Sequence, residues 1–259
     1  MSGEAPRLLE RTPATLAAEA GLLPAVFAGD VSGVLVRGFL TPEACAGIIE
    51  DLESSPLEAR DAAPFPGVTY GDVLVVSPPD LSHYHQAAAQ LEKALAPSGV
   101  VSRVIDAFDR VGGKASATVP GGYAPVTVRI LGPGQAVAAH SERTNWPSMA
   151  ALEPQLDPET TLSFYVPLAG AEAGGELVIY HRPPDGQRPA IEGKSPETTN
   201  ALLAAFGETR VRPGIGDLLL FDGGRFNHRV TPVEGEQARW TLGGFAGLDR
   251  GGRTIWVWS

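Results

Sequence analysis

Cysteine is almost absent from the chain, and Cys45 is its only residue of that type. One thiol excludes an internal disulfide and any zinc or iron–sulfur site built from several cysteines. Long apolar runs are also missing, because none approaches the ~20 residues that a membrane-spanning helix needs. The polar segment 1–11 lacks the apolar core of a signal peptide. These absences predict a cytoplasmic protein with no membrane partner.

Basic residues are scarce as well: 20 Lys and Arg stand against 30 Asp and Glu, which gives a net charge of −10. A surface that binds nucleic acid needs clustered Lys and Arg, so this balance argues against a nucleic-acid partner. The composition therefore favours a protein that acts on a small molecule.

The chain is long enough to bury a sizeable core, with 43% apolar residues among 259. No repeat, low-complexity tract or long linker divides it, so we expect a single domain over residues 1–259. Its first part, residues 1–115, is predicted to be rich in helix. One helix is expected to start at Thr41-Pro42-Glu43, where Thr is the N-cap and Pro occupies the first helical position. Further helices are expected over 80–96 and 100–111.

From residue 116 onward the pattern changes to strands. Glycine (31) and proline (23) make about a fifth of the chain, and many of them separate short β-rich segments. We expect strands in eight segments: 124–131, 135–142, 160–168, 175–182, 216–223, 226–233, 239–247 and 253–259. A helix is expected over 195–207, and the polar stretch 144–158 is predicted to be a loop or lid. Closely spaced strands preceded by helices are typical of a double-stranded β-helix, the cupin-like jelly roll. The sequence therefore predicts a mainly β fold with flanking helices and a jelly-roll core over 116–259.

Two of the five histidines lie in a pattern that fits a metal site. His140 and Glu142 end a predicted strand, and residues i and i+2 of a strand project from the same face. His228 lies in a later strand, just after a turn. Two His and one acid form the facial triad of non-haem Fe(II) oxygenases, which leaves three metal positions open for reactants.

Arg239 and Thr241 strengthen this interpretation, because they share one face of the strand that follows His228. An arginine there can pair bidentately with the carboxylate at the far end of a metal-bound ligand. The alternative is a metal-binding, cupin-like module without catalysis. Such a module needs no anchor for a dicarboxylate, so the Arg239-x-Thr241 pair favours an enzyme.

With these motifs the chain resembles the Fe(II)/2-oxoglutarate-dependent oxygenases, and most closely the branch with the carrier-independent aliphatic halogenases of indole alkaloid pathways. The resemblance rests on VRGFLTPEACAGIIEDLE, VRILGPGQAVAAH, LSFYVPLAGAEAGGELVIY, RPGIGDLLLFDGGRFNHRV and RWTLGGFAG through to WVWS, which cover most of residues 33–259. It implies a jelly-roll oxygenase that uses Fe(II), 2-oxoglutarate and O₂. His140 and His228 would be iron ligands, and Arg239, with Thr241, would hold 2-oxoglutarate. The substrate would be a free small molecule rather than one tethered to a carrier protein.

Glu142 departs from the pattern of those halogenases, which carry Gly at the acid position and bind chloride in the vacated site. A carboxylate in that position leaves no vacancy for a halide. We therefore expect a biosynthetic hydroxylase that oxidises an unactivated C–H bond and releases succinate and CO₂. The substrate type suggested by the kinship is an amino-acid derivative, alkaloid or nucleoside. Desaturation, cyclisation and halogenation by the same site are the alternatives.

Strand alternation predicts further residues of the cavity. In segment 160–168 the apolar residues share the face that fits beneath the helices, so Ser163 and Tyr165 are expected to face the metal. The same argument turns Thr127 and Arg129 inward, where Arg129 is a candidate anion partner for 2-oxoglutarate or substrate. Trp146, in the predicted lid, is a candidate substrate contact.

Overall fold

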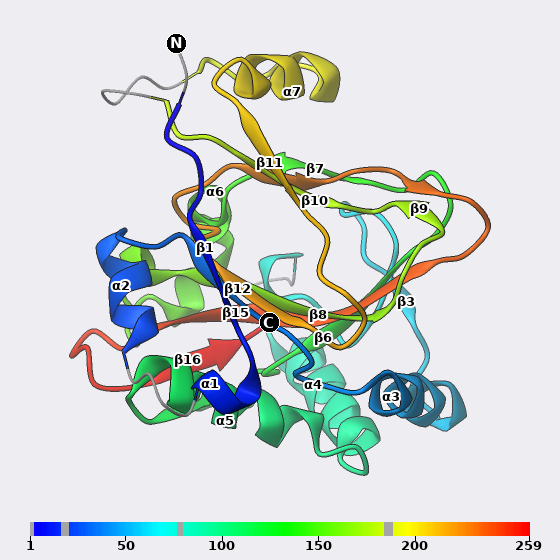
Figure 1. The fold of residues 1–259 in the computed structure, drawn as a ribbon. Coiled ribbons are helices and arrows are strands. Elements are labelled where there is room, and N and C mark those ends of the chain that lie inside the picture. The colour runs from blue at the N-terminus through cyan, green and yellow to red at the C-terminus, as the bar shows by residue number, and fades with distance from the viewer. Residues whose placement is uncertain (1–2, 17–20, 77–79, 184–188) are drawn as a thin grey trace.

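The computed structural model describes residues 3–16, 21–76, 80–183 and 189–259. Most helices in these ranges lie in the first half of the chain (Figure 1). They are α1 (Pro13–Leu16), α2 (Leu22–Ala28), α3 (Pro42–Ser54), η1 (Leu74–Val76), α4 (Ser82–Leu95), α5 (Val100–Gly112), α6 (Glu142–Asn145), η2 (Trp146–Leu152), η3 (Pro158–Thr160) and α7 (Pro196–Ala204). None of these described helices is long and apolar enough to cross a membrane.

A large, mainly antiparallel sheet forms the centre of the molecule. Its strands follow the order β1 (Leu8–Arg11), β2 (Gly33–Val36), β12 (Leu218–Phe221), β8 (Leu162–Ala169), β15 (Arg239–Leu248), β6 (Thr127–Leu131), β4 (Val68–Tyr70) and β3 (Arg60–Asp61). Two more strands extend it, because β16 (Ile255–Trp258) pairs with the far half of β15 and β5 (Ser116–Thr118) pairs with β16.

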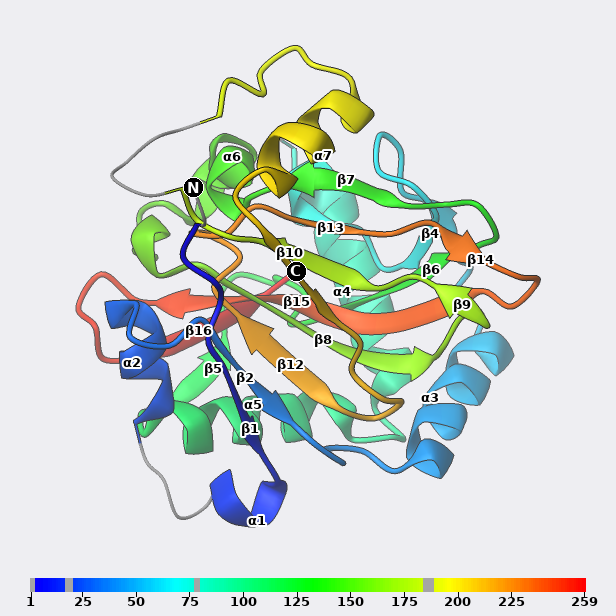
Figure 2. The same ribbon diagram turned by 45° about the horizontal axis from the view of Figure 1, so that its top comes forward.

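A smaller antiparallel sheet lies over the large one (Figures 1 and 2). It has the order β11 (Glu208–Val211), β10 (Leu177–Tyr180), β13 (His228–Val230) and β7 (Val137–His140), and a short pair, β9 (Ala173–Gly174) and β14 (Val233–Glu234), lies beside it. Helix α7 lies beyond the small sheet, whereas α3, α4 and α5 lie beneath the large one (Figure 1). This arrangement confirms the predicted mainly β jelly roll with flanking helices.

Two separate apolar clusters follow from the strand alternation. The even-numbered leucines of β12, Leu218 and Leu220, belong to the cluster shared with the helices, whereas Leu219 and Phe221 pack against the small sheet. Strand β8 behaves in the same way, since Phe164 meets the ring of Phe108 in α5 edge-to-face at 5.2 Å. The helix side of the large sheet is therefore sealed by apolar contacts, and the opposite face is free to carry polar side chains.

The N-terminus of α3 matches its prediction, because Thr41 Oγ1 accepts a hydrogen bond from the backbone N of Ala44 at 3.2 Å and Pro42 is the first helical residue. The stretch 144–158 differs from the predicted loop, since it holds the end of α6, the whole of η2 and the start of η3. Asp157 caps η3 by accepting from the backbone N of Glu159 at 3.1 Å. These short helical turns have no apolar periodicity of their own, which is why the sequence pattern did not reveal them.

Candidate metal centre

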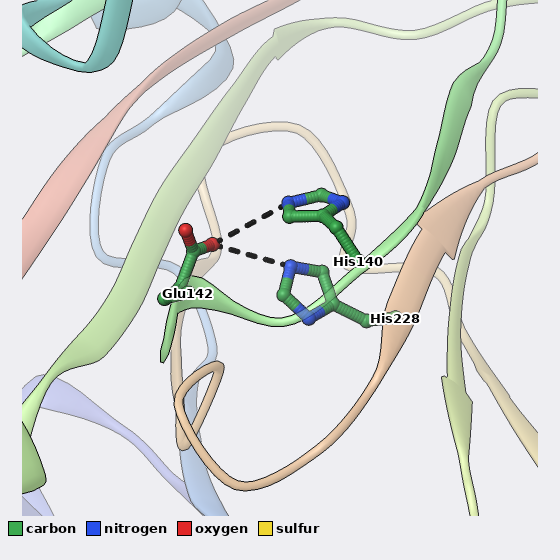
Figure 3. A group of neighbouring side chains, drawn as sticks. All are labelled: His140, Glu142 and His228. Atoms are coloured by element: carbon green, nitrogen blue, oxygen red, sulfur yellow. Dashed lines mark ion pairs between the residues drawn. The ribbon is translucent and has the colours of Figure 1, made fainter. Parts of the chain in front are cut away.

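His140, Glu142 and His228 converge between the two sheets (Figure 3). His140 ends β7 and His228 begins β13, and the two residues are direct partners in the antiparallel pairing of these strands. Their ring centroids lie 4.4 Å apart. Glu142 Oε1 lies 3.6 Å from His140 Nε2 and 3.3 Å from His228 Nε2. Two imidazole nitrogens and one carboxylate oxygen thus point at a common centre.

Glu142 is carried to this centre by a different secondary-structure element from the one that strand alternation predicts. Strand β7 stops at His140, and Glu142 is the first residue of α6. Its backbone N donates to the carbonyl of Gly223 at 2.9 Å, which ties it to the turn after β12. The convergence of His140 and Glu142 is therefore real, but the premise that both lie on one strand was wrong.

Backbone carbonyls orient both imidazoles. His140 Nδ1 lies 2.9 Å from the carbonyl oxygen of Ala138, and His228 Nδ1 lies 3.0 Å from that of Phe226. When Nδ1–H donates to a carbonyl, Nε2 carries the lone pair, which is the tautomer that a metal-binding His needs. Ser163 donates from Oγ to Glu142 Oε1 at 2.9 Å. The donor set fits a divalent cation, because each ligand atom is turned inward by a hydrogen bond behind it.

The charges of the three side chains are strongly coupled. Burial opposes ionisation of Glu142, but the two imidazoles outweigh it and hold the pKa of Glu142 well below its usual range. Burial, followed by the charge of His140, lowers the pKa of His228. Burial also disfavours the charged form of His140, yet Glu142 raises the pKa of that ring overall. The cluster thus holds an anionic carboxylate that attracts positive charge, and a metal ion that binds there displaces protons.

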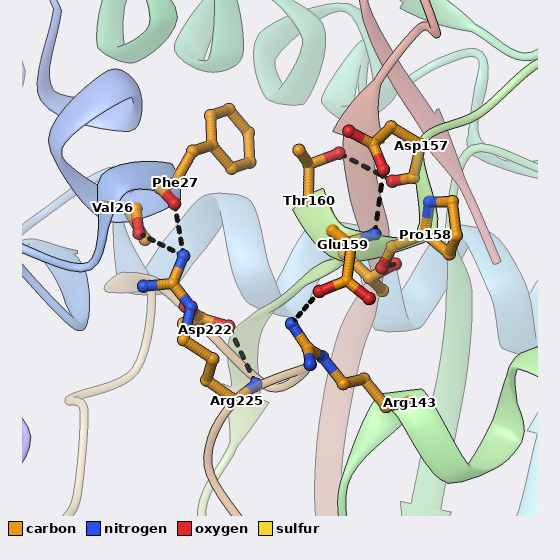
Figure 4. Close-up of polar contacts among 10 residues, drawn as sticks. Val26, Phe27, Arg143, Asp157, Pro158, Glu159, Thr160, Asp222 and Arg225 are labelled. Carbon is orange, nitrogen blue, oxygen red and sulfur yellow. Dashed lines mark hydrogen bonds and ion pairs between the residues drawn. The ribbon is translucent and has the colours of Figure 1, made fainter.

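The segments that carry His228 and Glu142 are tied to their surroundings by ion pairs (Figure 4). Arg225 pairs through Nε with Asp222 at 2.9 Å, and its other end donates to the carbonyls of Val26 and Phe27 at the end of α2. Arg143, next to Glu142, pairs with Glu159 in η3. Both contacts restrict the loops between the strands and so help to fix the positions of the metal-facing side chains.

A cavity of about 170 Å³ opens next to the cluster. Arg239 lines it from the start of β15, and Thr241 lies two residues further along the same strand. The guanidinium of Arg239 is buried and its Cζ lies 5.3 Å from the centre of the Tyr165 ring. The hydroxyl of Tyr165 is also buried, and the guanidinium of Arg239 acts on it and favours its ionised form. Burial raises the pKa of Tyr165 to about 12, so this hydroxyl is a donor at neutral pH.

The remaining predicted residues are placed as follows. Ser163 and Tyr165 of β8 line the cavity, as do Thr127 and Arg129 of β6. The hydroxyl of Thr127 lies 2.7 Å from that of Ser259. Trp146 begins η2, but its side chain lies outside the described part of the structure.

Several cavity residues were missed by the sequence reasoning. Phe65, Val73 and Val75 come from the connection around β4, where no periodic pattern marks an inward face. Strand alternation could have predicted Phe245 as a cavity residue, because it shares the face of Arg239 and Thr241 in one continuous strand.

Comparison with known proteins agrees with this geometry. The family described as carrier-protein-independent halogenase WelO5 matches residues 7–259. The chain belongs to this family. WelO5-family membership confirms the predicted placement among the Fe(II)/2-oxoglutarate-dependent oxygenases and identifies the protein as an enzyme. No curated protein matches the chain.

Solved structures support the WelO5-family fold assignment. An N-substituted L-amino acid dioxygenase from Burkholderia ambifaria AMMD has 18% identity over 93% of this chain and 91% of its own, with a TM-score of 0.58. The non-haem, α-ketoglutarate-dependent epimerase SnoN of nogalamycin biosynthesis has 13% identity over 91% of this chain and 86% of its own, with a TM-score of 0.52. HygX from Streptomyces hygroscopicus, solved with nickel and 2-oxoglutarate, has 14% identity over 86% of this chain and 85% of its own, with a TM-score of 0.51. At these identities the likeness concerns the fold.

Gly223 provides a test of how the cluster is built. A Cβ at this position would lie 2.2 Å from Ser163 Oγ and 3.0 Å from Glu142 Cγ. We expect Gly223→Ala to displace the Glu142 carboxylate and to weaken Fe(II) binding by about 10- to 100-fold, as is typical when groups behind metal ligands are disturbed. Calorimetric titration of Fe(II) under anaerobic conditions measures this change.

Gly47→Ala in α3 is the matched control, because a Cβ there meets nothing within 4 Å. Equal Fe(II) affinity of the Gly223→Ala variant and the control would mean that Glu142 does not bind the metal in the position described.

Proposed function

We propose that the protein is an Fe(II)/2-oxoglutarate-dependent dioxygenase that hydroxylates an unactivated C–H bond of a free-standing small molecule. The observation that carries this proposal is the Glu142 carboxylate, which lies between the two Nε2 atoms of His140 and His228. The three side chains are the protein ligands of iron, and they leave half of an octahedral ion open to reactants.

Iron held by His140, Glu142 and His228 would supply the redox chemistry that couples the conversion of O₂ and 2-oxoglutarate to succinate and CO₂ with oxidation of a substrate C–H bond. The task of this chain is to hold the reactants in place. The Ala138 and Phe226 carbonyls keep both imidazoles aligned, and Ser163 keeps the carboxylate turned toward them. Apolar residues around the cavity, including Phe221 and Phe245, restrict the access of water.

Arg239 is the anchor for the distal carboxylate of 2-oxoglutarate. Burial lowers the pKa of Arg239, and the hydroxyl of Tyr165, rather than a carboxylate, opposes that effect. A buried guanidinium without an acidic partner needs an anion, and its planar fork fits a carboxylate bidentately. The hydroxyls of Tyr165 and Thr241 also line the cavity and supply further donors.

Hydroxylation rather than halogenation follows from Glu142. The halogenase outcome requires a metal position open to chloride, and the Glu142 carboxylate, which accepts a hydrogen bond from Ser163, would fill that position. The narrow space around Gly223 is shaped for this side chain as well. The family description, carrier-protein-independent, supports a substrate that is not tethered to a carrier protein. We place the substrate among amino-acid derivatives, alkaloids and nucleosides.

The cofactor assignment predicts a visible absorption band when Fe(II)-loaded protein receives 2-oxoglutarate without oxygen. We expect His228→Ala to lose this band and nearly all iron, because two remaining ligands hold Fe(II) poorly. His83→Ala is the control, since His83 is an exposed histidine that pairs with Asp72 at 2.7 Å. Absorption spectra and iron stoichiometry check the result, and a His228→Ala protein with full iron and an unchanged band would refute the ligand assignment.

The role of Arg239 predicts a separate effect on the co-substrate. Arg239→Gln should raise the KM for 2-oxoglutarate by on the order of 100-fold and leave iron affinity nearly unchanged. The reason is that a buried carboxylate without its cationic partner costs several kcal/mol, on the order of 2–5. Succinate release at varied 2-oxoglutarate concentration measures the effect. An unchanged KM would remove Arg239 from the co-substrate site.

The identity of the third ligand predicts the product. In abundant chloride or bromide, the wild type should give only oxygenated product, whereas Glu142→Gly opens a position that a halide can enter. Halogenated product should then appear beside hydroxylated product, and mass spectrometry distinguishes them. Glu236→Gly, at an exposed acid in the loop before β15, is the control. Halogenated product from the wild type would contradict the assignment of Glu142 as a ligand.

A further inference from the structure

Arg129 is a second arginine of the cavity. Neither the metal site nor the proposed binding of 2-oxoglutarate by Arg239 gives it a role. It lies in the middle of β6, directly opposite Thr241 of β15 on one side and Thr69 of β4 on the other. Its side chain is half-buried, lines the cavity and stacks over Phe65, with Cζ 5.6 Å from the ring centre. In the described part of the chain it makes no hydrogen bond and no ion pair at contact distance.

The side-chain charges of the cavity show why Arg129 needs a ligand. Two arginines and one acid, Glu142, line it. Burial lowers the pKa of Arg129, Glu142 opposes that effect from a distance, and Arg239 adds to it. An arginine nevertheless stays protonated, so its partly buried charge has no direct counter-ion among the described residues, which is unfavourable. Once Glu142 binds the metal and Arg239 binds the co-substrate, Arg129 is the cavity arginine that still lacks an anionic partner.

The two arginines serve different ends of the cavity. Arg239 and Tyr165 also line a small neighbouring pocket between β8 and the turn before β10, where Gly174 and Gly175 lie. A Cβ at Gly175 would lie 2.9 Å from Arg239 Cδ, so that end is filled closely. Arg129 takes no part in that pocket and instead extends over Phe65, which stands in the connection before β4. The β8 end of the cavity thus offers Arg239 in a closely filled space, and the β4 end offers Arg129 beside Phe65.

The neighbours of Arg129 describe the rest of that second ligand. Phe65, Val73, Val75 and Phe245 line the cavity with apolar surface. The hydroxyls of Thr127 and Ser259, which also line the cavity, lie 2.7 Å apart and form a hydrogen bond with each other. A ligand that fits here has one anionic group and an apolar body.

We propose that Arg129 is the specificity-determining residue of the substrate site and that it binds the carboxylate of an anionic, otherwise apolar substrate. This inference rests on the proposed oxygenase function and narrows the substrate class from amino-acid derivatives, alkaloids and nucleosides to carboxylate-bearing small molecules. Arg129 holds the carboxylate through its planar fork, and the apolar body lies against Phe65, Val73 and Val75.

The test uses matched pairs of a carboxylate and its primary amide. Suitable pairs are N-acetyl-L-leucine and its amide, N-acetyl-L-phenylalanine and its amide, and indole-3-propionate and its amide. Each is titrated into protein loaded with Fe(II) and 2-oxoglutarate without oxygen, and binding is followed both by the change in the visible absorption band and by the shift in melting temperature. We expect at least one carboxylate to bind the wild type about 10- to 100-fold more tightly than its amide, as befits a charge-assisted hydrogen bond in a desolvated site.

Arg129→Gln should abolish that preference, whereas Arg129→Lys should keep part of it because the charge remains. Arg103→Gln, at an exposed arginine of α5 outside the cavity, is the matched control and should keep the full preference. The affinity for 2-oxoglutarate should change less than about 3-fold in Arg129→Gln, in contrast to Arg239→Gln.

Three results would overturn the proposal. The first is that no carboxylate binds the wild type more tightly than its amide. The second is that the preference survives in Arg129→Gln. The third is that Arg129→Gln weakens the binding of 2-oxoglutarate as strongly as Arg239→Gln does, which would assign Arg129 to the co-substrate site. Failure of the proposed function is recognised separately, because the wild type would then give no absorption band with 2-oxoglutarate, while the melting shifts would still report on the carboxylate–amide pairs.

Discussion

The burial of the Glu142 carboxylate between two imidazoles is the interaction on which the rest of the site depends. A buried carboxylate is unfavourable unless positive charge and hydrogen bonds compensate for it. Here His140 and His228 approach from paired strands, Ser163 donates from the large sheet, and Gly223 leaves the necessary space. Each of these contacts comes from a different segment of the chain, so the closed jelly roll is required to assemble them. In the proposed function, the same carboxylate limits which ligands an iron ion can still accept, and therefore which reaction follows.

The two faces of the large sheet have different roles, one in stabilising the fold and the other in forming the cavity. On the helix side of the large sheet, contacts such as that of Phe108 with Phe164 bury apolar surface and stabilise the fold. On the opposite face, β8, β15 and β6 present polar side chains to the cavity, two of them the guanidiniums of Arg239 and Arg129. Buried cations without a direct counter-ion favour anionic ligands. In our proposal, this burial gives specificity for the dicarboxylate co-substrate at Arg239 and for a carboxylate substrate at Arg129.

The sequence was informative wherever local chemistry repeats with a regular period. Alternation located β8 and β15, and the Thr41-Pro42 start located α3, because both patterns depend on neighbouring residues only. His140, Glu142 and His228 were found as a group from residue chemistry, yet the premise that Glu142 lies on a strand was wrong, since α6 begins there. The connection that brings Phe65 and Val73 to the cavity has no period, and its position depends on tertiary contacts. Such contacts are not encoded in any short stretch of sequence, which explains why these cavity residues were not predicted.

A crystal structure of the wild type, grown without oxygen in chloride-containing buffer with Fe(II) and 2-oxoglutarate, tests the central claim most directly. We expect one iron ion bound by His140 Nε2, His228 Nε2 and a Glu142 oxygen, with the distal carboxylate of 2-oxoglutarate on Arg239. An iron ion bound by the two histidines and a chloride, with Glu142 turned away, would contradict it.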